Sequence, residues 1–210
     1  MTTAVVFAGG DPPPAGVGDD LPDERWVVAA DGGADHALAA GIDVDLIVGD
    51  LDSIDPRTLE STAATVQRHP VDKDATDLEL ALAAVARRPE VTRVLVVGGN
   101  GGRLDHLLAN AAVMCSDRWL DLDIEWLAGP ARVTIVRDHA RIHGHPGETV
   151  SLIPLGGMAA GVRTTGLRWA LDGEDMIFGS SRGVSNEFAS AVATVSLRRG
   201  VVLAVQPTGC

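Results

Sequence analysis

The stretch Ile47-Val48-Gly49-Asp50-Leu51-Asp52-Ser53 is an apolar run that ends abruptly in two carboxylates. Together with the preceding Val44-Asp45-Leu46, it has the β-branched and apolar character of a buried strand in a parallel sheet. Asp50 and Asp52 follow at the carboxyl end of this strand, the edge where ligands bind in open α/β sheets. Two carboxylates that face one site repel each other unless a cation lies between them, and Mg²⁺ takes such oxygen ligands. The alternative is an ordinary polar turn that caps the next helix.

Acidic and glycine residues also follow a second predicted strand, residues 26–30, in the run Asp31-Gly32-Gly33-Ala34-Asp35. For Asp31 three partners are open: a metal, a sugar hydroxyl or a helix N-terminus. Asp35 would lie in the first turn of a helix predicted over residues 34–40. An interaction with the dipole of that helix explains Asp35 without a ligand.

A third group of acids precedes a predicted helix. Thr76 and Glu79 have the spacing of a capping box before an apolar-periodic segment, so we interpret both as structural. Asp74 and Asp77 place acids at the N-terminus of the same helix. Lys73 beside them either binds a phosphate as a point charge or is solvated.

A glycine-rich segment, Gly98–Gly102, follows the strongly apolar strand predicted at residues 93–97. Glycines at such density allow close backbone approach and positive φ angles. Arg103 then stands at the start of a predicted helix, so backbone N–H groups, helix dipole and guanidinium could together hold a phosphate. Asp105 either orients Arg103 or caps the helix. For His106, a hydrogen bond at the helix start and a role as a catalytic base are equally open.

The character of the sequence changes near Gly129-Pro130. Before this point strands alternate with helices, which predicts an α/β domain over residues 1–130 with a mostly parallel, Rossmann-like sheet. After it, residues 131–210 are expected to form an all-β sandwich domain. Trp169 within this domain is interpreted as a core residue, with stacking on a flat cationic ring as the alternative. The strands predicted in this domain are residues 131–136, 148–153, 192–197 and 201–205.

Composition limits the classes of function. A chain of 210 residues can form one large domain or two small ones, and its net charge of −12 argues against a nucleic-acid partner. A nucleotide is still compatible with this charge, because a metal inverts the local field. No apolar run is long enough for a bilayer, so no membrane partner is expected. Cys115 and Cys210 lie far apart and have no zinc spacing, which favours a cytoplasmic location. Neither common glycine-rich nucleotide fingerprint occurs.

Short motifs of this kind are spread over both predicted domains: Asp31-Gly-Gly-Ala-Asp35, Gly49-Asp-Leu-Asp-Ser53, Asp74-Ala-Thr-Asp77, Gly102-Arg-Leu-Asp105, Thr165-Gly-Leu-Arg-Trp169 and Ser185-Asn186. In this order they resemble the thiamine pyrophosphokinase (thiamine diphosphokinase) family. The resemblance implies transfer of the diphosphoryl group of ATP to the hydroxyethyl oxygen of thiamine, with AMP as the other product. It also implies a homodimer whose active sites lie at the subunit interface.

The resemblance further implies roles for individual residues. Asp50, Asp52 and Asp77 would hold Mg²⁺ against the phosphates of the co-substrate ATP, and Asp74 and Arg103 would complete the catalytic set. The ATP side would also include Asp31, Gly32, Gly33, Asp35, Lys73, Thr76, Gly102, Asp105 and His106. The thiamine side would consist of Trp169, Ser185 and Asn186, with the tryptophan stacked on a ring of the cation.

Two other classes of function remain open at this point. One is a related enzyme, either a pyrophosphokinase for another alcohol or a nucleotide hydrolase with the same metal site. The other is a non-catalytic sensor of thiamine or nucleotide. The acids argue against a sensor, because a binding protein need not keep so many like charges together.

Overall fold

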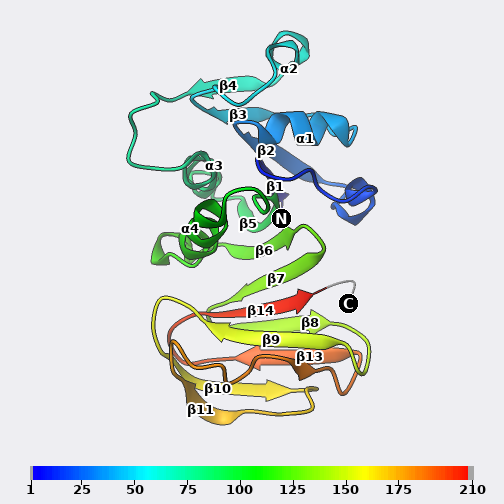
Figure 1. Ribbon diagram of the computed structural model, residues 1–210, viewed down its shortest axis with the longest axis vertical. Helices are drawn as coiled ribbons and strands as arrows, with labels where there is room; N and C mark the ends of the chain where they lie inside the picture. Colours follow the sequence, from blue (N-terminus) through cyan, green and yellow to red (C-terminus); the bar gives the residue numbers. More distant parts are fainter. Residues whose placement is uncertain (1, 208–210) are drawn as a thin grey trace. The chain divides into compact units, whose positions relative to one another are not determined.

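The computed structural model describes residues 2–207, which form two compact units, one up to Gly129 and one from Pro130 (Figure 1). Within these residues, every helix is too short or too polar to span a bilayer. The elements of the first unit are β1 (Thr2–Ala8), η1 (Val17–Asp20), β2 (Arg25–Ala30), α1 (Gly33–Ala39), β3 (Leu46–Gly49), α2 (Pro56–Ser61), β4 (Thr65–Arg68), α3 (Asp77–Ala86), β5 (Val91–Gly98), α4 (Leu104–Met114), η2 (Asp117–Trp119) and β6 (Asp123–Ala128).

The strands of the first unit follow the order β6-β5-β1-β2-β3-β4, and all neighbours pair in parallel. This confirms the mostly parallel α/β sheet. From β1 the chain runs outward through β2 and β3 to β4, and it then returns to place β5 on the other side of β1. The loops after β1 and β5 therefore leave the sheet in opposite directions, which opens a crevice at the carboxyl ends of the strands.

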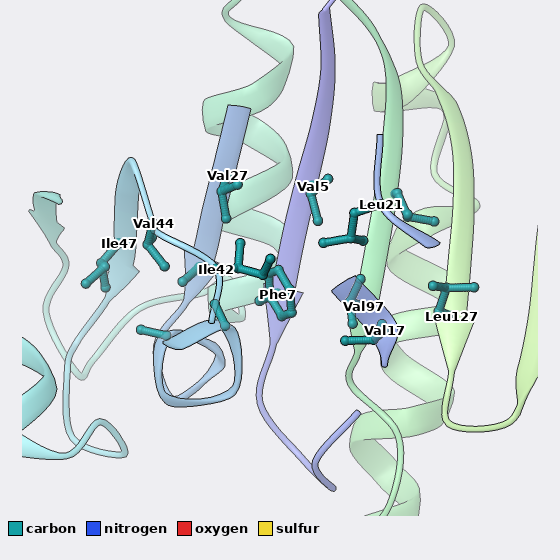
Figure 2. Close-up of a cluster of buried hydrophobic side chains, with 14 of the residues drawn as sticks. Val5, Phe7, Val17, Leu21, Val27, Ile42, Val44, Ile47, Val97 and Leu127 are labelled. Carbon is teal, nitrogen blue, oxygen red and sulfur yellow. The ribbon is translucent and has the colours of Figure 1, made fainter. Parts of the chain in front are cut away.

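Side chains that alternate along the central strands form the core on one face of this sheet. Figure 2 shows Val5 and Phe7 of β1 beside Val27 of β2, and these residues belong to one buried cluster with Ala34 and Ala37 of α1. Alternate residues of the same strands face the other way, where α3 contacts β1, β2 and β3. Figure 1 shows α1 and α3 on opposite sides of these strands.

Two local predictions for this unit need correction. The Pro, Gly and Asp content of residues 11–24 predicts a loop, but Val17 begins the short helix η1 there and is buried with Leu21 in the core (Figure 2). The strand before Asp50 begins at Leu46 rather than Val44, since its pairing with β2 starts there.

The second unit contains only strands among its described regular elements: β7 (Ala131–Val136), β8 (His139–His143), β9 (Thr149–Pro154), β10 (Ala159–Thr165), β11 (Asp172–Met176), β12 (Asn186–Glu187), β13 (Val192–Ser196) and β14 (Val202–Pro207). They pair antiparallel in two groups, β12-β9-β14-β7 and β11-β10-β13-β8. One buried cluster joins side chains of both groups, including Leu152 of β9 and Val195 of β13. The expected all-β character is therefore confirmed.

The four strands predicted in this unit are present, but β8, β10, β11 and β12 were missed. The strand β11 has the sequence Asp-Gly-Glu-Asp-Met, which has low β propensity and forms a strand through its pairing with β10. Tertiary pairing, rather than local preference, decides such strands.

Candidate active site

Two glycine loops meet in the crevice of the first unit. The N–H of Asp11 donates to Asn100 O at 2.8 Å, and the N–H of Gly99 donates to Gly9 O at 2.9 Å. A Cβ on Gly10 would lie 2.3 Å from Asn100 O, so only glycine allows these backbones to approach. The loops after β1 and β5 thus form one wall of backbone groups.

This wall borders a pocket of about 530 Å³. The amino ends of α3 and α4 also line it. The predicted ATP-side and catalytic residues that line it are Asp31, Gly32, Asp35, Thr76, Asp77, Gly102, Arg103 and His106. Other residues that line the pocket were not predicted from the sequence, among them Asp11, His36, Asn100 and Asn110.

Three aspartates converge at the edge of this pocket. Asp31 follows β2, Asp50 follows β3 and Asp77 begins α3, and one carboxylate oxygen from each lies within 4.8 Å of the others. A Cβ on Gly49 would lie 3.0 Å from the Cβ of Asp31 and 3.1 Å from Oδ1 of Asp77. The absence of a side chain at Gly49 therefore permits this convergence.

Asp31 is held in an unfavourable state. Its φ angle of 45° lies in the left-handed region, and its side chain is buried. Its Oδ2 accepts a hydrogen bond from the N–H of Ser53 at 3.3 Å, whereas its buried Oδ1 has no hydrogen-bond partner among the described residues. Burial, followed by repulsion from Asp77, raises the pKa of Asp31. Such strain at a pocket points to function rather than stability.

Lys73 lies between two of the three aspartates. Its Nζ donates to Oδ2 of Asp50 at 2.6 Å and lies 2.8 Å from Oδ1 of Asp77, and its side chain is only 13% exposed. Burial acts to lower the pKa of Lys73, but hydrogen bonds to both carboxylates outweigh it and raise that pKa. The hydrogen bond from Lys73 lowers the pKa of Asp50. The alternative of a solvated lysine is therefore wrong.

The aspartate cluster fits a divalent cation by its chemistry. It offers three hard carboxylate oxygen donors, and the unpartnered Oδ1 of Asp31 is available as a ligand. The structure thus brings together Asp50 and Asp77 of the predicted metal set and adds Asp31. Asp52 lies outside this group, is exposed and accepts a hydrogen bond from Ser53 Oγ at 2.9 Å. Asp74 is also exposed.

Asp35 links two helices. Its carboxylate accepts hydrogen bonds from the N–H of Asp55 at 3.0 Å and from Thr58 Oγ1 at 2.5 Å. Asp55 in turn caps α2 by accepting a hydrogen bond from the N–H of Arg57 at 2.8 Å. The carboxylate of Asp35 therefore connects α1 to α2, which the helix-dipole interpretation did not anticipate.

Two other predicted ATP-side residues have structural contacts. Oγ1 of Thr76 accepts a hydrogen bond from the N–H of Glu79 at 3.3 Å, so Thr76 caps α3 as its spacing predicted. A Cβ on Gly33 would lie 2.1 Å from Phe7 O, so this glycine allows α1 to pack against β1.

Arg103 and Asp105 form a two-point ion pair at the start of α4. Nε and Nη2 of Arg103 donate to the two oxygens of Asp105 at 3.2 and 2.6 Å. Hydrogen bonds from Arg103 lower the pKa of Asp105 to about 2. This corresponds to the first alternative for Asp105, in which it orients the arginine. His106 lines the pocket next to this pair and is exposed.

Asn110 supports the glycine loop from the inner face of α4. It is buried, and its Nδ2 donates to Gly99 O at 2.9 Å. The signal that could have found it is a single amide on the apolar face of a helix that follows a glycine-rich loop.

In the second unit, Trp169 is 52% exposed, so its interpretation as a core residue is wrong. The guanidinium of Arg168 lies over the indole at 4.6 Å. Asn186 is buried and clamps the Trp169 backbone, because its Oδ1 accepts from the Trp169 N–H at 3.1 Å and its Nδ2 donates to Trp169 O at 2.8 Å. Ser185 is exposed with a φ of 56°. The amide of Asn186 therefore serves to position the tryptophan.

Comparison with protein families gives a match for each unit. The family described as "Thiamin pyrophosphokinase, catalytic domain" matches residues 20–124, and "Thiamin pyrophosphokinase, vitamin B1 binding domain" matches residues 133–202. The pocket and the aspartate cluster lie mainly within the first match, and Trp169 lies within the second.

Individual relatives agree with these matches. Thiamine pyrophosphokinase 1 of Oryza sativa subsp. japonica is 32% identical over 158 residues, which are 68% of this chain and 58% of that protein. Thiamine pyrophosphokinase of Bacillus subtilis is 27% identical over 99% of this chain and 100% of that protein. The chain thus spans 58% of the rice relative but the whole of the bacterial one.

Solved structures share the fold. The crystal structure of thiamine pyrophosphokinase from Bacillus subtilis superposes with a TM-score of 0.85 at 24% identity, covering 100% of both chains. A thiamin pyrophosphokinase family protein from Enterococcus faecalis superposes with a TM-score of 0.81 at 26% identity, again over 100% of both chains.

Proposed function

The chain belongs to the thiamine pyrophosphokinase family, and we propose that it transfers the diphosphoryl group of ATP to thiamine, giving thiamine diphosphate and AMP. The observation that carries this proposal is the convergence of Asp31, Asp50 and Asp77 beside a pocket walled by glycine backbone. A triphosphate needs such a combination, because backbone N–H groups bind its oxygens while the acids hold its cation.

Asp31, Asp50 and Asp77 would hold Mg²⁺ in this proposal, and Asp52 remains a ligand predicted from the sequence. When bound, the cation would offset negative charge on the phosphates and help align them. Three carboxylates this close together repel one another, and a bound cation would offset that repulsion. We therefore assign them to the metal rather than assigning all three as bases.

The remaining residues of the pocket act on the nucleotide. Arg103, oriented by Asp105, would stabilise charge on the phosphates together with the N-terminus of α4. The alcohol oxygen of thiamine attacks the β-phosphorus, the bond from that phosphorus to the oxygen of AMP breaks, and a site aspartate accepts the alcohol proton. Positioning and charge stabilisation supply most of the rate in such transfers. The base is one of the aspartates at positions 50, 52, 74 and 77.

Trp169 would bind the cationic ring of thiamine. Its side chain is exposed, and Asn186 fixes its backbone through hydrogen bonds to both the N–H and the C=O of Trp169. Because Arg168 lies over one face of the indole, the thiamine ring would stack on the other face. Ser185, the exposed neighbour of Asn186, would provide a polar contact.

We further propose that residues 1–130 form a Rossmann-like domain that binds ATP, and that residues 131–210 form a β-sandwich domain that binds thiamine. The family resemblance supports a homodimer with active sites at the subunit interface. The two distant cysteines support a cytoplasmic location.

A Mg²⁺-dependent assay with ATP and thiamine tests the function, with AMP, ADP and thiamine phosphates resolved by chromatography. AMP and thiamine diphosphate in equal amounts are expected. ADP with unchanged thiamine would instead indicate a hydrolase. Thiamine binding without turnover would indicate a sensor.

A further inference from the structure

Lys73 is the only lysine among the 17 lysine and arginine residues of the sequence. At every other basic position the chain uses arginine. An ammonium is a compact charge on a flexible stem, whereas a guanidinium is a planar fork that binds carboxylates at two points. This single lysine is the residue whose ammonium contacts Asp50 and Asp77 in the aspartate cluster.

The ammonium of Lys73 neutralises two of the three carboxylates of this cluster. It contacts both Asp50 and Asp77 while it is largely shielded from solvent. A cation held by the same carboxylates would meet the positive ammonium at contact distance. Because like charges at such a distance repel strongly in a partly buried site, the two cannot share these oxygens in the present geometry.

We propose that Lys73 is a displaceable internal counter-ion, which neutralises Asp50 and Asp77 in the metal-free protein and gives way when a divalent cation binds. This inference rests on the proposed function. Lys73 lies in the loop between β4 and α3, and its four-carbon stem allows the ammonium to move without a rearrangement of either element. The released ammonium then contacts the phosphates of ATP, so that metal binding prepares the site for the nucleotide.

Selective labelling makes this exchange directly observable. Protein labelled with ¹⁵N only in lysine has one side-chain amine signal, because the sequence has one lysine. In the metal-free protein this signal should show the slow hydrogen exchange of a paired ammonium. Saturating Mg²⁺, without ATP or thiamine, should shift the signal and accelerate its exchange with water. A signal that stays unchanged while Mn²⁺ competition demonstrates bound Mg²⁺ would overturn the proposal.

Metal affinity supplies a second test, measured as Mn²⁺ binding by calorimetry in the absence of nucleotide. Lys73→Gln should bind Mn²⁺ about tenfold more tightly than the wild type, because the ammonium that competes with the metal for Asp50 and Asp77 is removed. Lys73→Arg should bind no more tightly than the wild type, since the guanidinium keeps the charge and grips carboxylates better.

Arg57→Gln is the matched control, because it removes a positive charge from α2, outside the aspartate cluster. It should change Mn²⁺ affinity by less than about twofold, as expected for an exposed and screened charge. The proposal fails if Lys73→Gln binds no more tightly than the wild type, or if Arg57→Gln has an equal effect. These measurements need no turnover, so a wild type that forms no thiamine diphosphate would refute the function without deciding the role of Lys73.

Discussion

Asp31 shows how a functional residue can oppose stability. Its burial and its Oδ1, which has no hydrogen-bond partner within residues 2–207, disfavour the charged side chain in the folded protein, and its left-handed φ adds backbone strain. Its pKa is raised, so the folded chain holds a proton at this carboxyl more tightly than the unfolded chain does. The contribution of Asp31 to stability therefore becomes less favourable as pH rises from the ordinary carboxyl value of 3.8 through the raised pKa.

Asp31→Asn should accordingly stabilise the metal-free protein at neutral pH. The amide keeps an oxygen for the Ser53 N–H but removes the buried charge. We expect a rise in Tm of roughly 2–4 °C, the change that about 1 kcal/mol causes in a domain of this size. Thermal unfolding in excess chelator measures it, and the gain should shrink as pH is lowered.

Asp43→Asn is the control for this variant, since Asp43 is an exposed acid outside the pocket. Its Tm should stay within about 1 °C of the wild type, as for most surface substitutions. A destabilised Asp31→Asn protein would show that the carboxylate contributes a favourable interaction in the metal-free fold.

Asp50→Asn should reduce kcat by about 10²–10³-fold or more, the scale for removal of one strong electrostatic stabiliser. Steady-state rates at saturating Mg²⁺, ATP and thiamine measure this effect. Asp43→Asn again serves as the comparison and should keep wild-type turnover. A folded Asp50→Asn enzyme with near-normal kcat would exclude Asp50 from the metal site.

At the scale of elements, the packing of α1 on β1 determines where the acids at positions 31 and 35 lie. Gly33 allows this packing, because any Cβ there would lie 2.1 Å from Phe7 O. Phe7 O is a backbone atom of the central strand β1. To accommodate a Cβ at position 33, α1 itself would therefore have to move.

Gly33→Ala should therefore destabilise the protein by about 1–3 kcal/mol, as is typical for overpacking. Urea unfolding measures the loss. Gly9→Ala is the matched control, because a Cβ on Gly9 has no atom within 4 Å and its φ is not left-handed. Equal stabilities of the two variants would show that α1 shifts at little cost.

At the scale of the whole molecule, the proposed homodimer with interface sites predicts complementation between two inactive variants. Asp50→Asn alters the metal side, and Trp169→Ala alters the thiamine side. If each site takes these sides from different subunits, a mixed dimer contains one intact site. Random re-association should then restore about a quarter of wild-type activity, because half of the dimers are mixed and each has one of two sites.

The assay is run at a thiamine concentration at which the Trp169→Ala enzyme alone shows no turnover. Re-association of each variant with itself is the control and should restore nothing. An absence of recovery, with mixed dimers demonstrated by differential tagging, would place both sides of a site in one subunit. A monomer by light scattering would refute the dimer itself.

Much of this architecture could be predicted from the sequence by itself. The alternation of apolar strands and helices predicted the parallel sheet, the change near Gly129-Pro130 predicted an all-β part, and the ordered motifs identified the family. Local capping at Thr76 was also predictable, because its bond to Glu79 depends only on neighbours along the chain. Such features are encoded in periodicity and short-range chemistry.

Only the tertiary structure decided which predicted residues meet. It joined Asp31 to Asp50 and Asp77, left Asp52 outside, and placed Lys73 between two carboxylates. These groupings depend on strand order and on the absence of a side chain at Gly49, which bring together residues distant in sequence. It also left the Trp169 side chain exposed, with the buried Asn186 hydrogen-bonded to the Trp169 backbone. Strand pairing and close approach act through space, so the one-dimensional pattern does not specify them.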